Sequence, residues 1–226
     1  MPASIAQRLP VLQQKIQHAA ISNPDTILFL AVSKGQPISA IQEAYALGLR
    51  HFGENYVQEA LKKQAALPSD INWHFIGQLQ KNKIPTISAH FQWVQGVSSV
   101  TQAQALSQHR SPSLPALQIC IQVNLDAETQ KNGCTPETLP ELISAIQALP
   151  HLQLQGLMAL PKLQLTAEKQ YASFSRFRIL RDSSAPSCNM LSMGTSDDFE
   201  AAIRAGSNCV RIGTALFGPR IRSDIP

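Results

Sequence analysis

The sequence predicts an α/β fold, a single (β/α)8 TIM barrel over residues 1–226 with an extra N-terminal helix. Short apolar runs alternate with helical patterns along the chain, at about 25–30 residues per unit, which is the spacing of βαβ units. About eight such units fill the chain, the number that closes this barrel. Several apolar runs also end in small or polar residues, as strands do where a barrel keeps its site. An open doubly wound sheet is the alternative.

The first half of the chain contains a leading helix and four strand–helix units. Apolar residues at helical spacing predict the leading helix over residues 1–20, in which Pro10 marks a kink or a late start. Apolar runs bounded by turn residues predict strands at 27–33, 49–52, 72–76 and 91–97. Helices are predicted after them at 37–46, 56–66, 79–89 and 99–109, the third interrupted by Pro85.

The second half repeats the alternation. Strands are predicted at 117–125, 152–160, 188–193 and 208–212. Helices are predicted at 136–149, 166–181 and 197–205, and residues 213–218 open a last short helix or turn. Asp197 and Glu200 fit a capping box at the start of the helix over 197–205.

Composition narrows the class of protein. A hydrophobic content of 44% predicts a sizeable core, and no apolar run has the length of a membrane span. The first twenty residues lack the apolar block of a signal peptide. The four scattered cysteines indicate reduced, packed thiols of a cytoplasmic protein, with no disulfide frame or metal site. A net charge of +4 without a dense basic block argues against nucleic acid and leaves a small anion such as phosphate.

Lys34 directly follows the first predicted strand and precedes Gly35. A buried strand that ends there places an amine at the mouth of the barrel, where such folds keep their sites. An isolated lysine in a turn is more often simply solvated. The turns that follow the last two strands favour a functional role for this one.

The last two predicted strands are followed by turns that combine glycine with hydroxyl side chains. The turns are 192–196 and 211–214. Backbone N–H groups ahead of a helix bind phosphate, and these two turns form the usual phosphate site of the fold. Arg211 adds a fixed planar cation. Because Asp197 and Asp198 crowd the first turn, we expect the phosphate to rely on the second.

A lysine that faces a phosphate site across a barrel mouth suggests one kind of ligand. A lysine whose pKa is lowered by apolar neighbours condenses with aldehydes. An aldehyde that also carries a phosphate is pyridoxal 5′-phosphate (PLP).

Six stretches resemble one known family. They are AVSK (31–34), FGENYVQE (52–59), WHFIGQLQKNK (73–83), GLMA (156–159), SMGTSDD (192–198) and VRIGTALFG (210–218). In this order, and over nearly the whole chain, they are similar to the pyridoxal phosphate homeostasis (PLP-binding) proteins, which resemble the barrel domain of alanine racemase.

The resemblance implies that PLP is held on Lys34 as a Schiff base. It further implies that Asn55 lies near the ring, that Met158 packs behind it, that Ser192, Thr195 and Ser196 lie near the phosphate, and that Arg211, Gly213 and Thr214 surround phosphate and ring. It implies a carrier or regulator of intracellular vitamin B6, with no catalytic residue. The partners it implies are PLP itself and PLP-dependent apoenzymes or enzymes of the B6 pathway.

The sequence departs from the family pattern at three positions. Gly35 replaces the usual threonine, Gln78 a common proline, and Thr195 the usual methionine. Gly35 is expected to loosen the loop beside Lys34. Lys131 matches a family region that carries a lysine, and we interpret it as solvated, with a second aldehyde contact as the alternative.

Two enzyme classes remain as alternatives. A PLP-dependent amino-acid racemase needs a second acid/base group opposite the lysine, which such barrels receive from a partner subunit's added domain. That domain is expected to be absent after Pro226, so a monomer is expected and Tyr56 is the one candidate base. A sugar-phosphate barrel enzyme needs paired acid/base groups at strand ends, where Glu54 is the only obvious carboxylate.

His74 lies inside a predicted strand beside Trp73 and is expected to be a packed, hydrogen-bonded core residue rather than a base.

Overall fold

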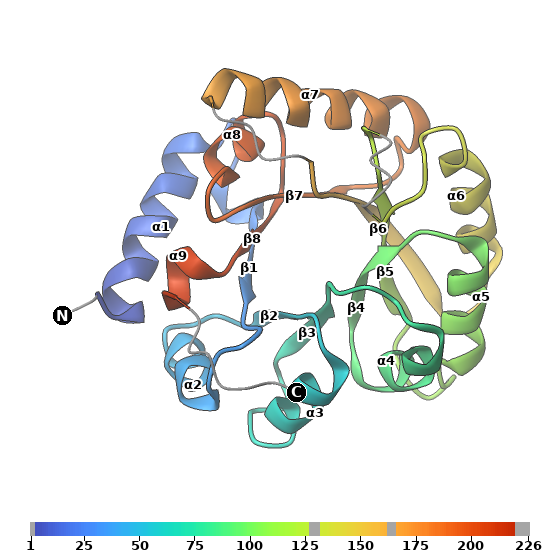
Figure 1. The fold of residues 1–226 in the computed structure, drawn as a ribbon, viewed down its shortest axis with the longest axis horizontal. Helices are drawn as coiled ribbons and strands as arrows, with labels where there is room; N and C mark the ends of the chain where they lie inside the picture. The colour runs from blue at the N-terminus through green and yellow to red at the C-terminus, as the bar shows by residue number, and fades with distance from the viewer. Residues whose placement is uncertain (1–2, 127–131, 162–165, 220–226) are drawn as a thin grey trace.

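Eight parallel strands close into a barrel in chain order, and helices surround it (Figure 1). The computed structural model describes residues 3–126, 132–161 and 166–219. The strands are β1 (Leu28–Val32), β2 (His51–Glu54), β3 (Asn72–Phe75), β4 (Trp93–Val97), β5 (Leu117–Val123), β6 (Leu152–Ala159), β7 (Met190–Thr195) and β8 (Cys209–Ile212). Because β8 pairs with β1, the predicted barrel is confirmed and the open sheet is excluded.

The helices between the strands form the outer ring. They are α1 (Ile5–Ala19), α2 (Ile38–Ala46), α3 (Val57–Gln64), α4 (Ile84–His90), α5 (Val100–His109), α6 (Leu139–Ala148), α7 (Ala167–Ser184), α8 (Phe199–Arg204) and α9 (Thr214–Phe217). Two short 3-10 helices are also present, η1 (Pro24–Thr26) and η2 (Lys81–Lys83). Among the helices of the described ranges, none combines the length and apolar character needed to cross a membrane.

Several predicted boundaries were wrong. The second, fourth and seventh strands begin two residues later than expected, at His51, Trp93 and Met190, where they enter register with their neighbours. The single helix predicted over 79–89 is instead η2 followed by α4. Pro85 lies in the first turn of α4 rather than interrupting the helix, because the first turn of a helix does not need the N–H that proline lacks.

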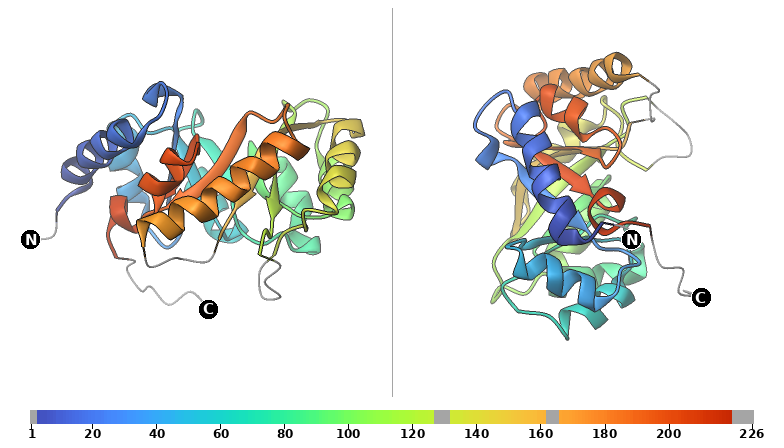
Figure 2. Two further views of the ribbon diagram at one scale, coloured as in Figure 1. Left: turned by 90° about the horizontal axis from the view of Figure 1, so that it is seen from above. Right: turned by 90° about the vertical axis from the view of Figure 1, so that its left-hand side faces the viewer.

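The N-terminal helix α1 completes the ring beside the last strand. It lies between α2 and the pair α8 and α9, as Figures 1 and 2 show. Lys15 pairs with Glu200 of α8 at 3.1 Å, and Arg8 donates to the Leu216 carbonyl of α9. A capping box between Ser4 and Gln7 starts the helix, which runs on through the exposed Pro10, so Pro10 does not mark a late start.

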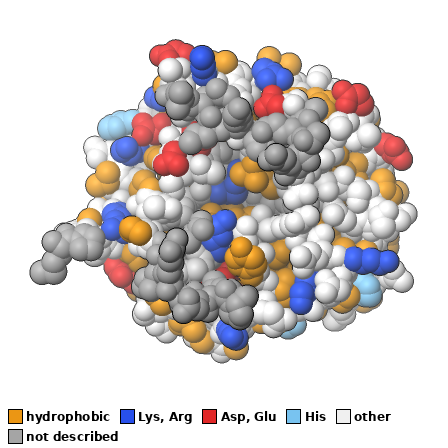
Figure 3. All heavy atoms as spheres, in the orientation of Figure 1, with side chains coloured by type: hydrophobic (Ala, Val, Ile, Leu, Met, Phe, Trp, Pro, Cys, Tyr) orange, Lys and Arg blue, Asp and Glu red, His pale blue; other side chains and the backbone are white. Residues whose placement is uncertain are grey.

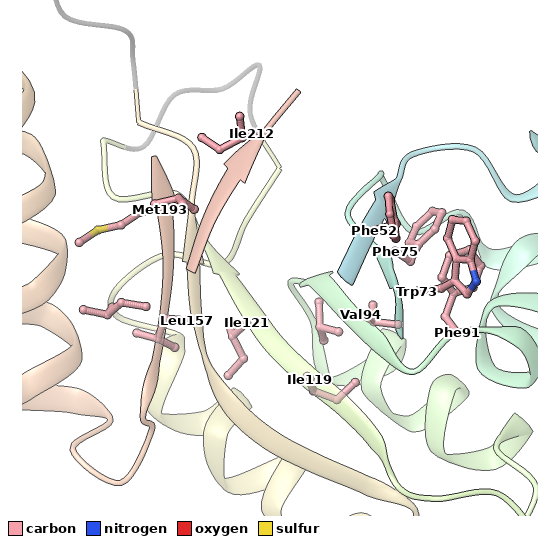
Figure 4. Close-up of a cluster of buried hydrophobic side chains, with 14 of the residues drawn as sticks. Phe52, Trp73, Phe75, Phe91, Val94, Ile119, Ile121, Leu157, Met193 and Ile212 are labelled. Carbon is pink, nitrogen blue, oxygen red and sulfur yellow. The ribbon is translucent and has the colours of Figure 1, made fainter. Parts of the chain in front are cut away.

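The apolar core lies between the barrel wall and the helices (Figure 4). Aromatic rings dominate one part of it, where Phe75 meets Phe91 edge to face and Phe52 packs against Trp73. All four cysteines lie in the described ranges as buried thiols, so the prediction of packed cysteines is confirmed. Close packing of this core fixes where each strand delivers its last residues.

Candidate functional site

One cavity opens at the carboxyl ends of the strands and gathers the predicted site. It has a volume of about 250 Å³. Figure 3 shows this face of the barrel, with Lys and Arg side chains at a central hollow. The lining residues are Val32, Lys34, Asn55, Ile76, Met158, Leu160, Thr195, Ser196, Asp197, Arg211, Gly213 and Thr214. All predicted site residues except Ser192 are among them.

Lys34 stands beside the strand-eight turn rather than across the mouth from it. The register pairs Leu30 of β1 with Arg211 of β8 and Ala31 with Ile212. The half-buried Lys34 therefore enters the cavity from the strand adjacent to Arg211. The expectation that the two lie on opposite sides of the mouth was wrong, because closure of the barrel joins the first strand to the last.

A buried ion cluster holds both peptide groups that flank Lys34. The Nζ of Lys63 on α3 donates to the Ser33 carbonyl at 2.7 Å, to Glu54 at 2.7 Å and to Glu59 at 2.6 Å. Glu59 accepts in turn from the Gly35 N–H at 2.6 Å. We call Glu54, Glu59 and Lys63 the lysine-loop clamp. It binds the backbone on either side of Lys34, which opposes the loosening expected from Gly35.

Glu54 belongs to this clamp and not to the cavity wall. It is fully buried and accepts from the Ser33 hydroxyl at 2.6 Å as well as from Lys63. Burial raises the pKa of this carboxyl to about 7, against the opposing effect of Lys63. The one carboxylate found at a strand end in the sequence therefore faces the protein interior, away from any substrate in the cavity.

Gly35 is held in the left-handed region, with a φ of +69°. We predict that Gly35→Ala lowers the free energy of unfolding by about 1–2 kcal/mol, because a Cβ is disfavoured at that φ. Gly35→Asn is the matched control and should cost less, since asparagine tolerates this conformation. Urea denaturation measures both, and equal stability of the alanine variant and the wild type would contradict the assigned conformation.

The strand-seven turn depends on Gly194 and Asp198. Gly194 has a φ of +93°, and a Cβ there would lie 2.6 Å from the Ala202 Cβ. Asp198 accepts from both the N–H and the hydroxyl of Thr195, at 2.6 and 3.0 Å. Asp198 is also the N-cap of α8, with no side-chain capping bond, so the predicted capping box of Asp197 and Glu200 was wrong. The carboxylate of Asp198 instead fixes Thr195 at the cavity wall.

Ser196 joins the strand-seven and strand-eight turns. Its hydroxyl oxygen accepts from the N–H groups of Gly213 and Ala215, both at 3.2 Å. These N–H groups therefore converge on an oxygen atom at the cavity edge, which is the arrangement that favours an anion. Asp197 also lines the cavity, so one carboxylate stands beside these donors.

Arg211 is buried, and Ser192 supports it from beneath. The guanidinium donates to the Ser192 hydroxyl and to the Ala159 carbonyl, each at 2.7 Å. Burial lowers the pKa of Arg211, but an arginine of this kind keeps its charge. Ser192 has no exposed surface and lies one layer below the lining residues.

His74 is the packed, hydrogen-bonded residue that the sequence predicted. It is fully buried, lies 2.9 Å from His51 and 3.0 Å from Gln95, and stacks on Trp93. Burial lowers the pKa of its imidazole well below the usual range, and His51 adds to this effect. The folded protein therefore holds His74 in its neutral form.

This burial predicts a loss of stability in acid. Below pH 6.5, His74 binds a proton in the unfolded chain but stays neutral in the folded protein. Unfolding therefore becomes more favourable as the pH falls. Relative to His74→Gln, the wild type should lose about 1.4 kcal/mol of unfolding free energy per pH unit below 6.5. Urea denaturation between pH 5 and 7.5 measures the difference. The opposite effect of Glu54 is common to both proteins, and parallel curves would contradict the prediction.

The tyrosines lie away from the cavity wall, all three of them in described parts of the chain. Tyr56 is the N-cap of α3 and is 58% exposed, Tyr171 is exposed on α7, and the Tyr45 hydroxyl donates to Asp70. Tyr56, the candidate second base, is therefore not among the residues that line the cavity. Lys131 falls outside the described residues.

Comparison with known sequences identifies relatives over nearly the whole chain. The family described as alanine racemase, N-terminal domain, matches residues 9–221. A relative from Pseudomonas aeruginosa, named pyridoxal phosphate homeostasis protein, is 49% identical over 222 residues, which is 96% of each protein.

Solved structures agree with this result. PipY of Synechococcus elongatus, solved with PLP bound, superposes with a TM-score of 0.82 at 37% identity, over 95% of this chain and all of PipY. Alanine racemase from Corynebacterium glutamicum gives a TM-score of 0.71 at 18% identity, over 98% of this chain and 62% of that protein. The latter likeness concerns the fold alone.

Proposed function

Because this chain belongs to the alanine racemase N-terminal domain family, among its pyridoxal phosphate homeostasis proteins, we propose that it binds pyridoxal 5′-phosphate on Lys34 as a carrier in vitamin B6 homeostasis. One observation carries the proposal. A single cavity combines a half-buried lysine, a buried arginine and two N–H groups of the strand-eight turn that converge on the Ser196 hydroxyl at its edge.

The cavity fits PLP in its size and in its polar groups. A volume of about 250 Å³ suits one substituted ring with a phosphate. The Oδ1 atom of Asn55 is buried in the wall without a hydrogen-bond partner among the described residues. A buried polar atom of this kind costs free energy until a partner arrives, so it favours a ligand that can hydrogen-bond there. Met158 and Ile76 supply the apolar surface that a ring requires.

Each part of the wall has a distinct task in this proposal. PLP supplies an aldehyde, whose condensation with the Nζ of Lys34 forms a C=N bond and releases one water. Ser196, Gly213 and Thr214 bind the phosphate, and Thr195 is held beside them by Asp198. Arg211 provides a fixed positive charge at the cavity floor.

We further propose that the protein exchanges PLP without converting amino acids. Racemisation needs an acid/base group on the face opposite the lysine. Among the residues that the structure describes, the cavity wall offers Lys34, the exposed Asp197 and Arg211 as titratable groups and contains no tyrosine or histidine. The name of the Pseudomonas aeruginosa relative, a homeostasis protein, also favours this choice.

Two measurements test the proposal. PLP should bind and produce the near-visible absorbance of a lysine Schiff base, whereas pyridoxal, which lacks the phosphate, should bind more weakly. Equal binding of the two would contradict the phosphate assignment. The loaded protein is then incubated with L-alanine and other L-amino acids, and chiral chromatography should detect no D-isomer. Racemised product would favour the racemase. Failure to bind PLP would contradict both the carrier and the racemase hypotheses.

A further inference from the structure

A line of polar side chains, all buried except the partly buried His51, crosses the barrel interior beneath the cavity. Its members are Arg211 of β8, Ser192 of β7, Gln95 of β4, His74 of β3 and His51 of β2. We call these five residues the relay. The Ser192 hydroxyl and the Gln95 Oε1 lie 2.6 Å apart although β7 and β4 are not neighbours, so this bond spans the lumen.

The direction of each hydrogen bond in the relay can be assigned by starting from Arg211. A guanidinium can only donate, so Ser192 accepts from Arg211 and gives its single proton to the Oε1 of Gln95. The Gln95 amide nitrogen then faces His74 at 3.0 Å and the Cys209 sulfur at 3.9 Å. The reverse amide orientation would present donors from both Arg211 and Gln95 to Ser192, whose proton would then have only the weak acceptor Cys209 Sγ.

The histidine tautomers follow from the same chain. Because Gln95 donates to the Nδ1 of His74, that ring carries its proton on Nε2. The Nε2–H then donates to the Nδ1 of His51 at 2.9 Å, which leaves the proton of His51 on its own Nε2. Burial lowers the pKa of both rings, in agreement with two neutral imidazoles.

From this geometry we propose that Gln95 and His74 are positioning residues for ligand binding, which act through Ser192 to hold Arg211 at the cavity floor. The relay leaves Ser192 without a proton for a ligand, so its task is to orient Arg211 rather than to contact phosphate. Gln95 and His74 lack any exposed surface and are not among the residues that line the cavity. Their effect on ligand binding rests on the proposed function, whereas the tautomers do not depend on it.

The first test uses the protein alone. Long-range ¹⁵N NMR of the wild type at pH 7.5, assigned with His51→Gln and His74→Gln, should show both rings protonated only on Nε2. In Ser192→Ala the amide of Gln95 loses its constraint, so His74 should show a mixture of tautomers. A proton on Nδ1 of His74 in the wild type, or the same single tautomer in Ser192→Ala, would overturn the relay.

The second test measures PLP binding. Gln95→Met should weaken binding about tenfold or more, and Ser192→Ala should do the same. The matched control is Gln122→Met, which removes a buried glutamine of β5 that donates to the Asn132 carbonyl and lies outside the relay. If Gln95→Met and Gln122→Met bind PLP alike, the positioning role is wrong. If the wild type binds no PLP, the proposed function is wrong, and the NMR experiment alone then decides whether the assigned tautomers are correct.

Discussion

Replacing Lys34 by alanine is expected to abolish the near-visible absorbance of the PLP-loaded protein. The C=N bond needs a primary amine, and Lys34 is the lysine that lines the cavity in the described part of the chain. The fold should survive, because the side chain is only half-buried and the lysine-loop clamp holds the backbone on both sides. Absorbance spectra and thermal unfolding of the apo protein measure the two effects.

The matched control for this variant is Lys62→Ala. Lys62 is exposed on α3 and outside the cavity wall, so its removal should leave the spectrum unchanged. Lys34→Arg adds a second control, because it keeps the positive charge and lacks the reactive amine. A full absorbance band in Lys34→Ala would show that another amine holds PLP.

Lys63→Met is expected to lower the free energy of unfolding by about 3–5 kcal/mol, because removing one partner of a buried ion pair leaves the other uncompensated. Lys63 is 4% exposed and makes three hydrogen bonds of 2.7 Å or less. Without it the fully buried Glu54 keeps only the Ser33 hydroxyl as a donor on one oxygen, and its Oε2 already lacks a described partner.

The pH dependence distinguishes this explanation from a simple packing defect. Lys63 lowers the pKa of Glu54, so its loss lets that pKa rise above about 7. The carboxyl of the variant is then neutral in mild acid, and the destabilisation should be smaller at pH 5 than at pH 8. Lys62→Met, on the exposed face of the same helix, is the control in urea denaturation. A loss below about 1 kcal/mol, typical of an exposed pair, would contradict the assigned role.

The barrel could be predicted because each strand carries its own signal. The apolar run of β5 and the turn residues after β1, β7 and β8 can be recognised without knowledge of the partners. That Lys34 and Arg211 reach the same end of the barrel followed, since parallel strands deliver their last residues to one face. That they lie on adjacent strands did not follow, because closure of the barrel pairs β1 with β8. The boundaries of β2 and β7 did not follow, because pairing with neighbouring strands decides them.

The two buried polar networks could not be read from the sequence. Glu59 and Lys63 are four residues apart on a helix, a spacing that normally indicates a solvated surface pair. Only the packing of α3 against the β1 loop turns them inward. The bond between Ser192 and Gln95 joins residues 97 positions apart across the lumen, so it exists only once the barrel has closed.

The most direct test of the central claim is to locate the bound PLP chemically. The wild-type protein is loaded with PLP, reduced with borohydride to make the C–N bond permanent, digested and mapped by mass spectrometry. The pyridoxyl group should appear on the peptide that contains Lys34, and Lys34→Ala treated in parallel should carry none there or elsewhere. A label on Lys62, Lys131 or any other lysine of the wild type, with Lys34 unmodified, would contradict the assignment of this cavity as the PLP site.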